Sequence, residues 1–147
     1  MENNKRIPAR EEIPAQDKWA IEDLYATDEL WEQELATLEE DRNELSSFNG
    51  KLGKRAEDLL AYMERSELLE VKAGKLANYC MRKADEDTRN ATYQAMVGKF
   101  MNAIVSLSAA TSFDTPEIMA LSEEEMESFY AQCPKLERFR RYLTNKR

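Results

Sequence analysis

Apolar residues recur at helical spacing along most of the chain. After Thr27, a single apolar stripe interrupted by Arg42 joins four positions, and glutamates fill the rest of the helical surface; the stripe is Trp31, Leu35, Leu38 and Leu45. Thr27 is a typical N-cap residue, and the acidic side chains of Asp28 and Glu29 favour the positive end of a helix dipole. The pattern predicts a long helix beginning there and packing on one side.

A turn is predicted next, because Asn49, Gly50 and Gly53 tolerate the left-handed backbone that ends helices. A second helix is expected over about residues 55–65. Ser66 offers a restart, after which a further apolar face continues to the polar cluster at residues 85–87. These two helices are close enough to be nearly continuous.

From Thr88 to Ser112 the chain has no Gly-Pro punctuation, and its apolar stripe is widened by Met96, Met101 and Val105. We expect this third helix to be the most buried element. Gly98 lies inside it and costs about 1 kcal/mol relative to alanine. Such a cost is usually tolerated where another backbone approaches closely, and we expect that here.

The last third predicts shorter helices. Thr115 followed by Pro116 reads as a cap with proline at the first helical position, and Ser122 with Glu125 fits a capping box. Pro134 then stops one helix, and the apolar spacing continues to the end. No segment alternates with a strand period, so we predict an all-α fold: an antiparallel bundle of about five to seven helices over residues 27–147, preceded by an extended arm over residues 1–26 that carries apolar anchors.

The net charge and the composition argue against nucleic-acid and membrane partners. The 147 residues carry a net charge of −8, so the field of the chain repels phosphate backbones, and we expect no nucleic-acid partner. No run approaches the roughly 20 apolar residues of a membrane span, and the start lacks the apolar core of a secretory signal. We therefore expect no membrane association and a cytoplasmic location.

The charges are unevenly distributed. Residues 28–44 hold eight acidic side chains against Arg42, and residues 135–147 hold six basic side chains against Glu137. Solvated helix faces account for both runs. The alternative is that the two segments are neighbours and dock through opposite charge.

The absence of histidine excludes most catalytic centres within the chain. Ser-His and Cys-His nucleophiles, zinc sites with imidazole ligands and the Glu-x-x-His pairs of di-iron bundles all need that residue. Two glutamate runs carry carboxylates on one helix, but neither has such a partner; they are Glu39, Glu40 and Glu44, and Glu123, Glu124 and Glu125. Cys80 and Cys133 are far apart and are expected to be reduced. We assign no catalytic residue and no metal ligand, and the substrate-binding residues are left open.

A set of short segments lies in a fixed order along the chain: Ile13-Pro14, residues 18–25 (KWAIEDLY), Asp28, Trp31, Gly50-Lys51-Leu52, Tyr79 ahead of residues 85–88 (DEDT), Ser112-Phe113 ahead of Pro116-Glu117-Ile118, and Arg141-Tyr142-Leu143. In order and spacing these segments resemble the amino-terminal region of the oligoendopeptidase F family of zinc metallopeptidases. The similarity covers nearly the whole chain, with Ala20 departing from the acidic residue expected there.

The resemblance implies a fragment of a longer enzyme. Members of this family hydrolyse short peptides with zinc held by a His-Glu-x-x-His helix and a downstream glutamate, in a later catalytic domain. The amino-terminal helices form one wall over a deep cleft. This chain is then expected to hold no cofactor and to be inactive alone. Its expected partner is the catalytic domain of the same polypeptide, and short peptides are the expected substrates of the whole enzyme. When the catalytic domain is missing, we expect the chain to self-associate.

Two other classes remain open. One is a stand-alone acidic helical interaction module that recruits a partner helix, and the other is a metal-free hydrolase that acts alone. Five aromatic residues are expected in the core: Trp19, Tyr25, Trp31, Tyr79 and Phe113. The alternative for a few residues is a place on the cleft wall, and Tyr79 and the turn at residues 85–88 are singled out for it by their position at a helix end.

Overall fold

The computed structural model describes residues 6–146, and this part of the chain is entirely helical and irregular, without a strand. The all-α prediction is confirmed. The α-helices are α1 (Asp28–Ser46), α2 (Ala56–Glu86), α3 (Ala91–Ala110), α4 (Asp114–Met119), α5 (Glu123–Gln132) and α6 (Arg140–Lys146), and the 3-10 helices are η1 (Arg10–Glu12), η2 (Ala15–Asp17), η3 (Ile21–Asp23) and η4 (Pro134–Phe139).

Local capping signals place several helix starts. The Thr27 hydroxyl accepts a hydrogen bond from the Leu30 amide, and Ser122 with Glu125 forms the expected capping box. The third helix begins later than predicted, because Asn90, not Thr88, caps it with its side-chain oxygen.

The helix predicted from a Thr115 cap also begins elsewhere. The turn after α3 runs directly into α4, which starts at Asp114 and follows Phe113. Pro116 therefore lies in the first turn, where its missing N–H leaves no helical hydrogen bond unmade. The Thr115 hydroxyl donates to Asp114 and does not cap the helix.

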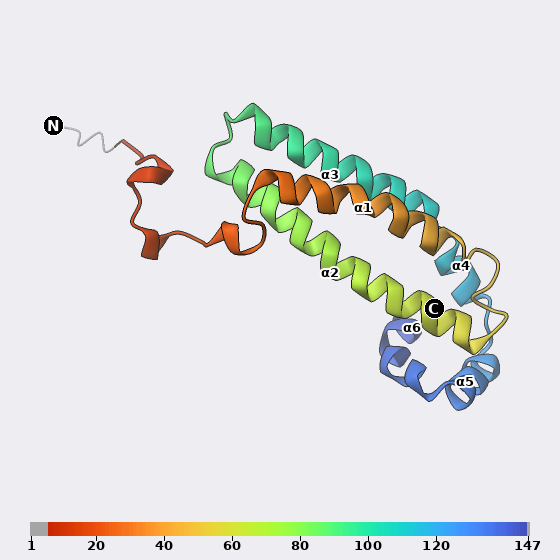
Figure 1. The fold of residues 1–147 in the computed structure, drawn as a ribbon. Coiled ribbons are helices and arrows are strands. Elements are labelled where there is room, and N and C mark those ends of the chain that lie inside the picture. The colour runs from red at the N-terminus through yellow and green to blue at the C-terminus, as the bar shows by residue number, and fades with distance from the viewer. Residues whose placement is uncertain (1–5, 147) are drawn as a thin grey trace.

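Helix α2 is one continuous helix of 31 residues, so the restart considered at Ser66 does not occur. It is the central element, and α1 and α3 both pack against it and against each other (Figure 1). The indole N–H of Trp31 donates to the Leu76 carbonyl at 2.9 Å, which ties α1 to the middle of α2. Nearby, the Lys72 ammonium contacts the buried Asp41 carboxylate at 2.5 Å.

Helix α3 contradicts the prediction that it is the most buried element. Only Met96 and Phe100 of its 20 residues are buried, whereas α2 buries nine of its residues. One face packs on α1 and α2, and the opposite face meets no other described part of the chain, leaving Met101 and Val105 exposed. The expected close contact at Gly98 is also wrong, since a Cβ there would meet nothing within 4 Å.

The short helices α5, η4 and α6 gather at the end of the bundle where α2 begins, far from the arm (Figure 1). The basic residues of this segment do not dock on the acidic run of α1. Arg138 pairs with Glu67, Arg140 with Glu127 and Glu137, and Lys146 with Asp114. The acidic side chains of α1 pair instead with lysines and arginines from its own helix and from α2 and α3: Arg42, Arg65, Lys72, Lys75 and Lys99.

Candidate functional site

Within residues 6–146, no group of three or more His, Cys, Asp or Glu side chains lies close enough together to hold a metal ion. The helices in this range also lack the length and apolar character needed to cross a bilayer. One concave surface is formed by the arm where it crosses the C-terminal half of α2. We take this surface as the candidate site.

The arm is anchored on α2 by two buried side chains, the first of which also lines the site. Ile21 and Tyr25 lie in the core, and the Tyr25 ring meets the Tyr79 ring edge-on at a centroid distance of 5.3 Å. The Tyr79 hydroxyl donates to the Asp28 carboxylate at 2.7 Å. Burial, more than the neighbouring carboxylate, raises the pKa of the Tyr79 phenol. Tyr79 therefore lies in the core, as expected, where it ties α1 to α2.

Trp19 departs from the core role expected of it. Its side chain is 72% exposed, and it stands between two hollows of about 290 and 270 Å³. Trp19, Ile21 and Arg82 line both hollows. The rest of the first hollow is Arg10, Asp17, Lys18, Asp85 and Glu86, and the rest of the second is Ala20, Leu24, Gly74, Lys75 and Asn78.

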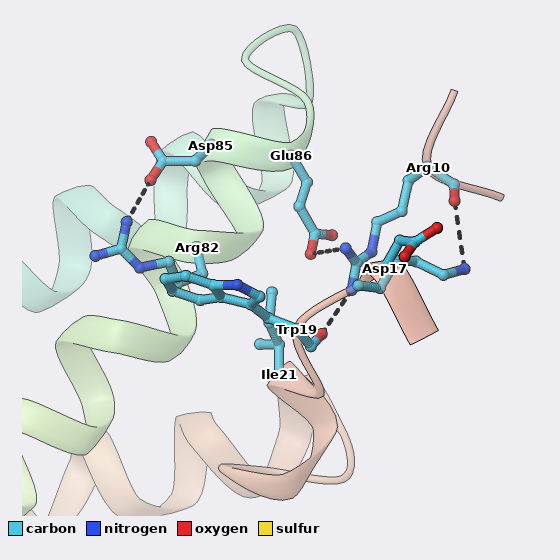
Figure 2. Close-up of a pocket in the computed structure, with 8 residues that line it drawn as sticks. Arg10, Asp17, Trp19, Ile21, Arg82, Asp85 and Glu86 are labelled. Carbon is cyan, nitrogen blue, oxygen red and sulfur yellow. Dashed lines mark hydrogen bonds and ion pairs between the residues drawn. The ribbon is translucent and has the colours of Figure 1, made fainter. Parts of the chain in front are cut away.

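Figure 2 shows how charged side chains hold the arm around the first hollow. Arg10 pairs with Glu86 at 2.7 Å and also donates to the Trp19 carbonyl at 3.1 Å. Burial raises the pKa of the Glu86 carboxyl, although the nearby Arg10 and Lys83 cations oppose that shift. The arm is therefore fastened to the C-terminal end of α2 by one partly buried ion pair.

The Trp19 ring is fastened by a second contact, with Arg82. The guanidinium carbon lies 5.4 Å from the ring centroid, within the range of a cation–π interaction, and the same guanidinium contacts Asp85 at 3.1 Å. The turn at residues 85–88 is thus brought only partly to the site. Asp85 and Glu86 line the hollow, whereas Asp87 turns back to bond Arg89.

A separate concave region, away from the two hollows beside Trp19, lies between α2 and α3 and has a volume of about 390 Å³. Its walls are mostly apolar and its end is closed by the Asp114 carboxylate, which accepts from the Lys146 ammonium at 2.6 Å and the Tyr62 hydroxyl at 3.0 Å. Burial raises the pKa of Asp114, but the hydrogen bonds from Lys146, Thr115 and Tyr62 outweigh burial and leave it below its ordinary value.

Sequence reasoning missed Trp19 and the Asp114–Lys146 pair as surface features. The arm has no periodicity that would place Trp19 inside or outside, and the pair joins residues 32 positions apart. One signal was available: Gly74 interrupts a helix face without ending the helix, and it lines the second hollow.

No family model matches the chain, but individual proteins do. It is 29% identical over 131 residues to oligopeptidase PepF of Bacillus subtilis, covering 89% of this chain and 20% of that protein. It is 32% identical over 111 residues to the group B oligopeptidase PepB of Streptococcus agalactiae, covering 76% of this chain and 18% of that protein.

The fold agrees with these relatives. The solved structure of oligoendopeptidase-F from Enterococcus faecium superposes with a TM-score of 0.73 and 26% identity, over 82% of this chain and 24% of that one. The chain therefore spans about a fifth of the length of the curated relatives that it matches. Sequence and fold point to the same group of proteins, and over the helical region that it covers the chain belongs to the oligoendopeptidase F family.

Proposed function

We propose that this chain is the non-catalytic amino-terminal domain of a cytoplasmic, zinc-dependent oligoendopeptidase, in which it forms one wall of the cleft that admits short peptides. The observation that carries the proposal is the agreement of sequence and fold with a fifth to a quarter of each relative. The division into an arm (residues 1–26) and a helical domain (residues 27–147) is part of the same proposal.

The residues present do not fit a zinc site of the His-Glu-x-x-His type, because the chain contains no histidine. Zinc and the general base would therefore be supplied by the catalytic part of the same polypeptide. The role of these helices is to restrict access to the cleft and to bind the peptide. A wall beside the cleft excludes folded proteins by size, and its side chains hold an extended peptide in place.

The exposed surface of helix α3 is evidence for contact with a partner domain. Lys99 is its single charged residue, yet most of the helix is exposed, and Met101 and Val105 lie on its outer face. Exposed apolar surface of this kind typically marks an interface. Gly98 lies on the same face with open space beside it, so a partner can approach the helix backbone closely. We infer that the catalytic part of the polypeptide rests on this face.

The same face favours the second candidate function, a stand-alone interaction module that recruits a partner helix. The two functions differ in where the partner is encoded. Reading the coding sequence beyond Arg147 separates them: an open frame with a downstream His-Glu-x-x-His segment supports the peptidase domain, and a stop codon with no such segment contradicts it.

The α3 contact is tested in the longer polypeptide by Val105→Glu, with Val71→Glu as the matched control. Both valines are mostly exposed here, but Val71 lies on α2. A glutamate buried against the catalytic part is costly, so we expect V105E to lower peptide hydrolysis and thermal stability, while V71E leaves both unchanged. Equal effects of the two variants would remove α3 as the contact.

A further inference from the structure

Gly74 occupies a position in α2 where glycine lowers the stability of the helix. It lies in the interior of α2, where glycine costs about 1 kcal/mol relative to alanine. Close packing does not explain it, because a Cβ at this position would meet no atom within 4 Å. What the missing side chain does is keep open the second hollow, of about 270 Å³, beside Trp19.

The hollow is suited to an apolar side chain. Ile21 and Leu24 line it together with Ala20, and the Trp19 ring forms the wall that it shares with the first hollow. Trp19 is mostly exposed although it is among the largest apolar side chains, and an indole face is a surface on which a peptide backbone or side chain can pack. The two hollows share Trp19, Ile21 and Arg82 in their lining and therefore adjoin each other at the ring.

The side chains that line the two hollows include one more cation than carboxylate. Four cations line the two hollows against three carboxylates, whereas the chain carries −8; the cations are Arg10, Lys18, Lys75 and Arg82, and the carboxylates are Asp17, Asp85 and Glu86. Arg82 lines both hollows, and 43% of its side chain remains exposed. Trp19 and Asp85 hold its guanidinium in place, and because a guanidinium has five N–H donors, those not used by Asp85 are positioned for a second carboxylate.

We propose that this surface binds the C-terminal end of a short peptide, with an apolar side chain in the Gly74 hollow, the backbone over Trp19 and the free carboxylate against Arg82. The choice of a peptide as ligand rests on the proposed function above. The position of the site and its preference for an apolar residue and a free carboxylate rest on the residues of the two hollows. The site binds and does not cleave.

The test is a fluorescence titration of the isolated chain with trileucine. Trp31 is fully buried and Trp19 is exposed, so a ligand-dependent change in tryptophan emission reports on Trp19. We expect saturable binding to the free acid, with affinity at least about tenfold weaker for the C-terminal amide and for the Arg82→Gln variant, because each removes one partner of the ion pair.

Two glycine variants complete the test. Gly74→Leu fills the hollow, and Gly98→Leu makes the same change at another open, interior helix position on α3. Both gain helix propensity and are expected to melt no lower than the parent, so loss of folding does not confound the comparison. We expect G74L to lose binding by about tenfold or more and G98L to keep it.

Absence of saturable binding, equal binding of acid and amide, or equal loss in both glycine variants would overturn this inference. Its failure is distinguishable from failure of the proposed function. A downstream zinc motif without peptide binding removes only the Trp19 site, whereas peptide binding without such a motif removes the peptidase assignment and leaves the site.

Discussion

The contact between Trp31 and α2 gives the sharpest test of the fold. Trp31 has no exposed surface, and its indole N–H donates to the Leu76 carbonyl. Substitution by phenylalanine removes that hydrogen bond, at a cost of about 1 kcal/mol. The smaller ring also leaves a void on the order of 40 Å³, which adds about 1 kcal/mol at roughly 24 cal/mol per Å³. Lost apolar burial adds about 1 kcal/mol more.

We therefore expect Trp31→Phe to lower the free energy of unfolding by about 3 kcal/mol and the melting temperature by about 10 °C. Urea and thermal unfolding followed by far-ultraviolet circular dichroism measure both quantities. Trp19→Phe is the matched control, since the same substitution at a mostly exposed ring is expected to change stability by less than about 0.5 kcal/mol. Similar losses in the two variants would refute the placement of one tryptophan inside and the other outside.

Three further predictions concern single groups. The pKa of Asp114 is lowered in the folded chain, so its contribution to stability is present above the ordinary pKa of an aspartate and is lost as the pH falls through the lower folded value. Asp114→Asn should therefore flatten the acid limb of a stability–pH curve, and an unchanged limb would contradict this. Burial raises the pKa of the Cys80 thiol to about 11. At about pH 8 a thiol reagent should therefore modify Cys133 first and Cys80 only on unfolding, and equal rates of modification at the two cysteines would be the contrary result. Glu117 accepts from the Gly50 and Leu52 amides, and Glu117→Ala should cost about 1–3 kcal/mol by leaving those amides unpaired, whereas a loss below the error of urea unfolding would show that the turn does not depend on it.

Local signals predicted the parts of the fold that depend on neighbouring residues. Thr27 and Ser122 carry cap chemistry within three residues of their partners, and both helices start where predicted. Gly50 adopts a φ of +74° in the turn between α1 and α2, as its position between two helical patterns indicated. Ser66 was ambiguous because serine tolerates a helix interior as well as a cap, and here the apolar face continues through it.

The errors concern what each face contacts, which depends on residues far apart in the sequence. The apolar pattern of α3 was recognised, but a pattern cannot show whether its partner is another helix of the chain. Tyr79 is buried as expected, but its bond to Asp28 joins residues 51 positions apart and no local pattern indicates it. Trp19 lies in an arm of short 3-10 turns, where no periodicity separates an inner from an outer side.

If these helices hold peptides and do not cut them, the isolated chain binds trileucine and leaves it intact. To test this, the chain is titrated with trileucine in the presence of zinc while tryptophan fluorescence is recorded; bound zinc is then determined by mass spectrometry and the peptide by chromatography. We expect a saturable change in Trp19 emission, recovery of the peptide intact and no stoichiometric zinc. Tightly held zinc together with peptide turnover in the purified chain would contradict this expectation.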